Sequence, residues 1–179
     1  MADRGGQPSP PDPRLVVLAG APATGKTTVA QLLLAATEDA GWVDGDDLWR
    51  INPWVVNDRT KRLVEDNLVA VLGNFLDAGY STVILSWVLP RASILSRLVA
   101  GLGDRPHQLW PFVLTCSRQT LAARFAADPA RGEVTAAALA CLAQTRRLPW
   151  PQINTDGRSA AAVAAEVDAS LRAGQGGPG

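Results

Sequence analysis

The chain has 179 residues, of which 47% are hydrophobic and 19% are charged, and its formal net charge at pH 7 is zero. This length suits one domain with a well-buried core. The zero net charge argues against a nucleic acid or an anionic membrane as the main partner. No apolar run approaches the length of a membrane span, and residues 1–13 lack the apolar core of a signal peptide. The sequence therefore predicts a cytoplasmic protein.

The two ends of the chain have compositions that disfavour regular structure. Residues 1–13 are rich in proline, which removes backbone donors and fixes φ, and residues 174–179 are rich in glycine. We expect disordered or flexible tails there and one domain over residues 14–173. The two cysteines, Cys116 and Cys141, lack metal-ligand spacing, so we predict that both are buried thiols.

Between the tails, short apolar runs alternate with segments of helical periodicity. The runs predict strands at 15–19, 42–44, 82–86, 112–115 and 152–154. The periodic segments predict helices at 26–40, 58–78, 90–102, 118–127, 133–147 and 159–173. Short, almost continuously apolar runs fit parallel strands buried on both faces. The alternation predicts a three-layer α/β/α sandwich around a five-stranded parallel sheet, in which ligands gather at the carboxyl ends of the strands.

Four residues mark expected helix ends. Gly41, Gly79 and Gly174 follow predicted helices at the position where a terminal glycine is common. Ser159 precedes the last predicted helix, where its hydroxyl can cap the free N–H groups.

The pattern G-x-x-x-x-G-K-[ST] follows the first predicted strand. It consists of Gly20, Ala21, Pro22, Ala23, Thr24, Gly25, Lys26 and Thr27, and Thr28 continues into the helix. Glycines let successive N–H groups converge on phosphate oxygens, and the following helix presents its positive end to the same anion. Lys26 can reach the β- and γ-phosphates, and the Thr27 hydroxyl can ligate magnesium. The motif therefore predicts ATP and Mg²⁺ as cofactors; the alternative is a glycine-rich turn that binds nothing.

An acidic turn follows the second predicted strand. Switch-type and motor NTPases usually place a magnesium-binding aspartate at the end of a neighbouring strand, but here the run 82–86 ends in Ser86. The acids are instead Asp44, Asp46 and Asp47. A base that accepts the proton of a substrate hydroxyl belongs at this edge in phosphoryl transfer. The alternative is a solvated turn with a helix-capping aspartate.

These motifs resemble those of the shikimate kinase and gluconate kinase group of P-loop kinases, with nucleoside monophosphate kinases and chloramphenicol phosphotransferase as wider relatives. The resemblance covers roughly residues 14–173 and is carried by the phosphate loop and by the turn Asp44-Gly45-Asp46-Asp47. It implies a P-loop NTPase fold of the nucleoside monophosphate kinase type with a helical lid. It also implies that Asp44 holds magnesium through water and that Asp46 orients and deprotonates the acceptor hydroxyl.

The resemblance further implies an arginine-bearing lid after the fourth strand, at about residues 117–131. Arg124 and Arg131 are the candidates for neutralising charge near the γ-phosphate, with Arg146 and Arg147 as second choices. The alternative is a solvated helix with scattered arginines. After the fifth strand, residues 154–158 match the loop that packs on adenine in such kinases.

The acceptor region departs from both named kinases. Shikimate kinases have a glycine-rich stretch where this chain has residues 86–90, and the gluconate kinase pattern is not completed beyond the acidic turn. Three tryptophans and several cations are candidates for acceptor binding, because flat rings stack on sugars or bases and guanidinium groups pair with acids. They are Trp49, Trp54 and Trp87, with Arg59 and Arg62 and the neighbouring Arg50 and Lys61. Core packing and solvated helix faces are the alternatives, and His107 is expected to be structural or exposed.

The sequence thus predicts a magnesium- and ATP-dependent kinase, monomeric or homodimeric, that phosphorylates a hydroxyl group of a small-molecule acceptor. A sugar, a sugar acid, a nucleoside and a hydroxylated antibiotic all remain open as acceptors, and the last would imply a resistance role. A nucleoside monophosphate kinase is an alternative within enzymes. An NTP-binding regulatory protein without turnover is the alternative from another class.

Overall fold

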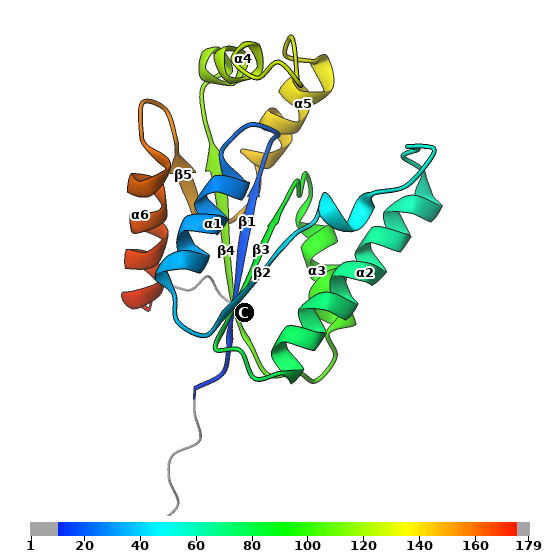
Figure 1. The fold of residues 1–179 in the computed structure, drawn as a ribbon, viewed down its shortest axis with the longest axis vertical. Helices are drawn as coiled ribbons and strands as arrows, with labels where there is room; N and C mark the ends of the chain where they lie inside the picture. Colours follow the sequence, from blue (N-terminus) through cyan, green and yellow to red (C-terminus); the bar gives the residue numbers. More distant parts are fainter. Residues whose placement is uncertain (1–10, 175–179) are drawn as a thin grey trace, which may run out of the picture.

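A five-stranded parallel sheet organises the chain in this computed structural model, which describes residues 11–174 (Figure 1). The strands are β1 (Arg14–Gly20), β2 (Ala40–Asp44), β3 (Thr82–Trp87), β4 (Gln108–Thr115) and β5 (Gln152–Asn154). They lie in the order β2-β3-β1-β4-β5, and every neighbouring pair is parallel. The central strand β1 therefore delivers the phosphate loop to the middle of the carboxyl edge. The predictions for residues 1–10 and 175–179 lie outside the described residues.

Helices cover both faces of the sheet, which confirms the predicted three-layer sandwich (Figure 1). They are α1 (Lys26–Ala36), α2 (Asp58–Asp77), α3 (Ala92–Gly101), α4 (Arg118–Ala126), α5 (Ala136–Thr145) and α6 (Ala160–Arg172), with a short 3-10 helix η1 (Asp47–Trp49). The pair α1 and α6 packs on one face and the pair α2 and α3 on the other, while α4 and α5 lie beyond the carboxyl ends of β1 and β4. No helix within residues 11–174 is both long and apolar enough to cross a membrane.

The central strand is buried on both faces, as its apolar run predicted. Leu15 and Val17 pack in the core under α2 and α3, whereas Val16 and Leu18 pack in the core under α1 and α6. This alternation follows from the two-residue period of a strand. A third apolar cluster joins the phosphate loop to α4 and α5, and it contains Ala21, Cys116, Leu121, Phe125, Ala138 and Leu142. The helical lid region is thus packed onto the loop that it overlies.

Two predictions about local structure are wrong. The first helix ends at Ala36, and Gly41 lies inside β2 rather than at a helix terminus, because the chain turns at Asp39 with φ 53. Glycine at this position makes room for the Phe75 ring, because a Cβ atom at Gly41 would come within 2.5 Å of that ring. Cys116 is buried as predicted, but Cys141 is only partly buried.

Other helix ends agree with the sequence. Gly79 and Gly174 follow helices with φ values of 86 and 72, in the left-handed region that favours glycine. Ser159 caps α6, and its Oγ accepts a hydrogen bond from the Ala162 N–H at 3.2 Å.

Candidate functional site

The phosphate loop connects β1 to α1 and has the backbone geometry that an anion cradle needs. Gly20 has φ 152, and a Cβ atom there would lie 2.5 Å from the Leu114 carbonyl oxygen, so no larger residue fits. Gly25 has φ 95 and turns the chain into α1 at Lys26. The first N–H groups of α1 have no partners within the helix and point into the loop, where an anion can accept their hydrogen bonds.

Lys26 lies within this loop. Its ammonium group donates a hydrogen bond to the Ala21 carbonyl oxygen at 2.9 Å, and the buried Thr24 hydroxyl donates to the same oxygen at 2.9 Å. Burial of Lys26 lowers its pKa to about 8, while the carboxylates of Asp46 and Asp44 oppose this shift. The charged ammonium is therefore poorly solvated, and phosphate oxygens would stabilise it.

Arg124 fixes the outer side of the loop. Its guanidinium group extends from α4 and donates to the carbonyl oxygens of Ala23 at 3.2 Å and Thr155 at 2.9 Å, and also to the Thr155 hydroxyl at 3.1 Å. Ala23 has φ 60, a conformation that costs a non-glycine residue about 1–2 kcal/mol. Arg124 thus ties a strained position of the phosphate loop to the loop between β5 and α6.

The acidic turn at the end of β2 meets the phosphate loop through Asp44. Its Oδ2 atom accepts hydrogen bonds from the Thr27 hydroxyl at 2.8 Å and the Ser86 hydroxyl at 2.9 Å. Its Oδ1 atom accepts one from the backbone N–H of Asp46 at 3.1 Å. Four segments, namely β2, the turn after it, β3 and the start of α1, are therefore joined at one carboxylate.

The residues present fit a magnesium ion. Because the Thr27 hydroxyl donates its only proton to Asp44, its lone pairs are free for a cation. Asp44 keeps an unused acceptor position on Oδ1, which a metal-bound water can occupy. No cluster of three or more carboxylate, histidine or cysteine side chains suited to a metal occurs within residues 11–174. This sparse donor set suits Mg²⁺, which usually keeps several waters and is held by one or two protein groups together with substrate phosphates.

Asp46 lies on the same turn and lines a cavity together with Lys26, Thr27 and Asp44. Restricted hydration raises its pKa, and the nearby Asp44 carboxylate adds to this shift, while Lys26 and the Trp87 indole oppose it. The turn rests directly on Trp87, because a Cβ atom at Gly45 would come within 2.3 Å of the indole ring. A carboxylate with a raised pKa is a better proton acceptor than an ordinary aspartate.

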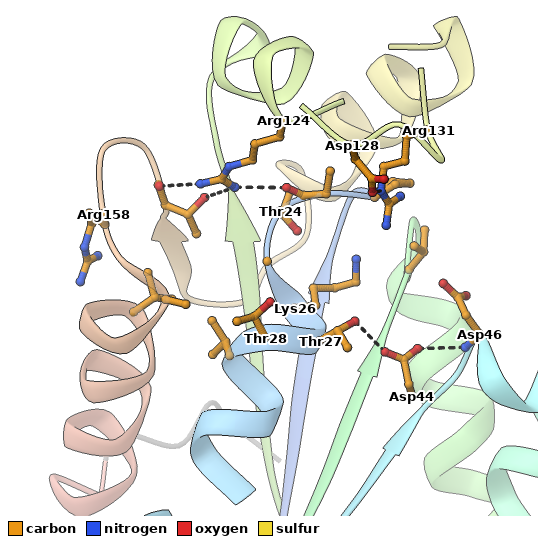
Figure 2. Close-up of a pocket in the computed structure, with 18 residues that line it drawn as sticks. Thr24, Lys26, Thr27, Thr28, Asp44, Asp46, Arg124, Asp128, Arg131 and Arg158 are labelled. Carbon is orange, nitrogen blue, oxygen red and sulfur yellow. Dashed lines mark hydrogen bonds and ion pairs between the residues drawn. The ribbon is translucent and has the colours of Figure 1, made fainter. Parts of the chain in front are cut away.

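One cavity of about 390 Å³ brings most of these groups together (Figure 2). Figure 2 shows Lys26, Thr27, Asp44 and Asp46 along its floor, with Arg124 and Arg131 above them. The lining residues are Pro22, Ala23, Thr24, Gly25, Lys26, Thr27, Thr28, Val29, Asp44, Asp46, Val88, Arg124, Asp128, Arg131, Thr155, Arg158, Ala160 and Val163. The structure thus assembles at one place the predicted phosphate, metal and base residues.

Arg131 lines this cavity but is held by its own loop. Its Nε atom donates to Asp128 Oδ2 at 2.8 Å, and its guanidinium carbon lies 5.7 Å from the centre of the Phe125 ring. Asp128 also accepts from the Ala130 N–H, which makes a tight turn after α4. Asp128 takes only the Nε donor of Arg131, so the other guanidinium donors remain available to a phosphate.

The three tryptophans predicted to bind the acceptor lie outside the cavity lining. Trp87 is 5% exposed and supports the acidic turn from below, so its ring is not an open stacking surface. Trp49 packs between Trp87 and Trp54, with ring centres 6.3 Å and 5.1 Å away. Trp54 is 61% exposed at the outer end of this stack.

The remaining cationic candidates are dispersed. Arg59 and Arg62 are exposed and line a separate shallow groove along α2. Arg50 pairs with Asp47 at the surface. Arg146 donates to the Thr115 hydroxyl and the Cys116 carbonyl oxygen, so it supports the end of β4. His107 contacts the Arg105 carbonyl oxygen at 2.8 Å, in keeping with a structural role.

Two polar residues of the site were not predicted. In the sequence Ser86 is only a strand end without an acid, whereas in the structure its hydroxyl donates to Asp44. Asp128 lies within the predicted lid segment and pairs with Arg131, and its spacing of three residues from that arginine is the signal that could have indicated the ion pair.

The strand–loop–helix cradle at the centre of a parallel sheet defines a P-loop NTP-binding protein. A protein-family profile described as "AAA domain" matches residues 16–137, and the chain belongs to this family. Comparison with curated protein sequences gave no match.

Three solved structures show the same fold. A sugar kinase from Janibacter sp. HTCC2649 has 18% sequence identity and a TM-score of 0.68, over 89% of this chain and 95% of that chain. The tunicamycin resistance protein of Deinococcus radiodurans has 17% identity and a TM-score of 0.67, over 89% and 95%. A gluconokinase from Sinorhizobium meliloti 1021 has 18% identity and a TM-score of 0.66, over 92% and 94%. The predicted resemblance to P-loop small-molecule kinases is thereby confirmed.

Proposed function

We propose that this protein is an ATP-dependent kinase that transfers the γ-phosphoryl group to a hydroxyl group of a small molecule. The observation that carries this proposal is the position of Asp46, which lines one cavity with Lys26, Thr27 and Asp44. Phosphoryl transfer requires mainly positioning and charge neutralisation, so these groups suffice without a covalent nucleophile.

Each residue has a distinct part in the proposed reaction. The N–H groups of the loop and the Lys26 ammonium bind the β- and γ-phosphates. Asp46 orients the acceptor hydroxyl and takes its proton as the new O–P bond forms and the bond to the β-phosphate oxygen breaks, which releases ADP. Arg131, which lines the same cavity, neutralises charge on the transferred group.

Thr27 directly, and Asp44 through a bridging water, would hold Mg²⁺. The ion would neutralise phosphate charge when bound. The adenine end of the nucleotide would lie beside α6, where Arg158, Ala160 and Val163 line the same cavity. Arg158 donates to the carbonyl oxygens of Asn154 and Ala162 and pairs with Glu166, so it shapes this end as a fixed wall.

The surroundings of Asp46 support an acceptor without a phosphate group. A nucleoside monophosphate would need cations near Asp46, but Arg59 and Arg62 line a separate groove. We favour a sugar, a sugar acid or a hydroxylated antibiotic, since a sugar kinase, a gluconokinase and a tunicamycin resistance protein share the fold. A regulatory NTP-binding protein would have no need of a carboxylate with a raised pKa on the acceptor side of the phosphates. A cytoplasmic location and a monomeric or homodimeric state stay predictions.

An ADP-release assay tests the proposal. The purified protein is incubated with MgATP and a panel of sugars, sugar acids, nucleosides, nucleoside monophosphates and hydroxylated antibiotics, and the product is identified by mass spectrometry. We expect an acceptor-dependent gain of one phosphoryl group in the wild type and none with Lys26→Ala. If ATP binds but no acceptor on the panel raises ADP release above the background, the regulatory alternative is favoured.

A further inference from the structure

A chain of hydrogen bonds runs from the core under α1 to the phosphate loop. The Trp42 indole N–H donates to Ser86 Oγ at 3.0 Å, and the Ser86 hydroxyl donates to Asp44 Oδ2 at 2.9 Å. The Thr27 hydroxyl donates to the same Asp44 oxygen at 2.8 Å. The chain therefore ends at the proposed magnesium ligand.

The register of two strands brings these side chains together. On β2 and β3, Trp42 lies opposite Ile84 and Asp44 lies opposite Ser86. Residues two apart on a strand share a face, and Trp42 and Ile84 both pack in the core under α1 and α6. The indole therefore reaches along this face to the next pair in the ladder. Ser86 is fully buried there, so its hydroxyl depends on protein groups for its hydrogen bonds.

The direction of every bond in the chain is determined. An indole N–H can only donate, and an ionised carboxylate can only accept. The Ser86 oxygen must therefore accept from Trp42, and its one proton is left for Asp44. Trp42 thus keeps the Ser86 hydroxyl from turning elsewhere, and Ser86 in turn holds the Asp44 oxygen to which Thr27 also donates.

We infer that Trp42 is a positioning residue for magnesium. Trp42 acts through the buried Ser86 hydroxyl, which fixes the Asp44 carboxylate and, with it, the lone pairs of Thr27. The inference rests on the proposed use of a magnesium nucleotide. It also accounts for the missing acid at the end of β3: the acid comes from β2, and the β3 position supplies the hydroxyl that orients it. Outer partners of this kind tune metal affinity, because they set the orientation of the ligating group.

The chain offers a matched control for Trp42. Trp110 packs in the same core cluster and is 5% exposed, yet its indole N–H is buried without a hydrogen-bond partner among residues 11–174. The changes Trp42→Phe and Trp110→Phe remove the same atoms from one core. They differ in that only the first breaks a hydrogen bond to Ser86.

Isothermal titration calorimetry with the nonhydrolysable ATP analogue AMPPNP tests the inference without an acceptor. Each protein is titrated with excess Mg²⁺ and with EDTA, and the ratio of the two affinities measures the magnesium contribution. The ratio belongs to the folded molecules alone, so partial loss of stability does not change it. We expect Trp42→Phe to lower it about two- to tenfold, the value of one hydrogen bond. We expect Ser86→Ala to lower it about tenfold or more, as for a direct partner of a metal ligand.

The double variant Trp42→Phe/Ser86→Ala should have the ratio of Ser86→Ala alone, because Trp42 acts through Ser86. Additive losses would overturn this route, and so would a Trp42→Phe ratio equal to that of Trp110→Phe or the wild type. An equal loss of affinity with and without magnesium would indicate a general packing role and also overturn the inference. If the wild-type protein binds AMPPNP equally well with Mg²⁺ and with EDTA, the proposed metal site itself is wrong. The kinase proposal is judged separately by acceptor phosphorylation.

Discussion

The Lys26 ammonium donates a hydrogen bond to the Ala21 carbonyl oxygen, 2.9 Å away, and so turns back into the loop that precedes it. This contact occupies the charged group while no phosphate is present. Bound phosphates would compete for it, because a charged acceptor makes a stronger hydrogen bond than a neutral carbonyl. The Lys26 ammonium is therefore positioned inside the phosphate loop and does not extend into solvent.

Replacement of Lys26 by alanine is predicted to abolish phosphoryl transfer while the fold survives. The loop would lose the point charge that it places at the β- and γ-phosphates, and loss of such a preorganised group costs a factor on the order of 10²–10³ in rate. The measurement is acceptor-dependent ADP release, with circular dichroism as the check of folding. Near-normal turnover in a folded Lys26→Ala protein would contradict the assignment of the loop.

Nucleotide binding is predicted to take up a proton in mildly alkaline solution. The pKa of Lys26 is lowered to about 8 by burial, so above that pH the free protein holds the neutral amine. Phosphate oxygens favour the ammonium form and raise the pKa again, so binding must add a proton and must weaken as the pH rises. Calorimetry of ADP binding at about pH 8.5, in buffers with different ionisation enthalpies, measures this uptake.

Lys26→Arg is the control for this proton uptake, since an arginine stays charged in both states. Its binding heat should not depend on the buffer, even if its affinity differs from that of the wild type. Buffer-independent heats for the wild-type protein at the same pH would show that the Lys26 amine does not change its protonation on binding.

The lid should have a fixed part and a moving part. Arg124 and the Ser117 N–H, which donates to Asp156 at 2.9 Å, tie α4 to the loop after β5. Residues 127–135 carry Arg131 and have no comparable bond to the rest of the site among the described residues. Hydrogen exchange should therefore be slow in residues 118–126 already in the free protein. In residues 127–135 it should be fast and should slow when nucleotide and acceptor bind. High protection of both segments in the free protein would rule out a mobile lid.

The phosphate loop and the sheet could be predicted because their signals are local. The glycines, Lys26 and Thr27 have their roles at fixed spacing, and apolar runs buried on both faces indicate parallel strands. The relationships across the site could not be predicted in this way. Ser86 meets Asp44 only because β2 and β3 pair in a particular register. Trp87 was expected at the acceptor, but the close approach of Gly45 buries it under the turn. Such contacts depend on tertiary packing that single-sequence patterns do not encode.

Asp46→Asn separates a kinase from a nucleotide-binding module. If Asp46 takes the acceptor proton, turnover should fall by a factor on the order of 10²–10⁴, the usual contribution of a positioned general base. Affinity for MgATP should change far less than turnover, because the substitution lies on the acceptor side of the γ-phosphate and acts on the phosphates only through Lys26. Asp47→Asn is the control, since Asp47 pairs with Arg50 at the surface and should matter little for turnover.

The same variant should be at least as stable as the wild type at neutral pH. Restricted hydration, together with the Asp44 charge, raises the pKa of Asp46 above its ordinary value of 3.8. Between the unfolded-state pKa and the raised folded-state pKa, the folded state binds more protons than the unfolded state. Stability therefore falls as the pH rises through this window and stays reduced above it. Asparagine removes this cost, so the melting temperature of Asp46→Asn should equal or exceed that of the wild type at pH 7. The difference in melting temperature between the two proteins should shrink in acid, where Asp46 is protonated in both the folded and the unfolded state. If Asp46→Asn loses stability at pH 7 as well as turnover, Asp46 stabilises the turn rather than acting as a base. If turnover is undiminished, the reaction proceeds by positioning and charge neutralisation alone.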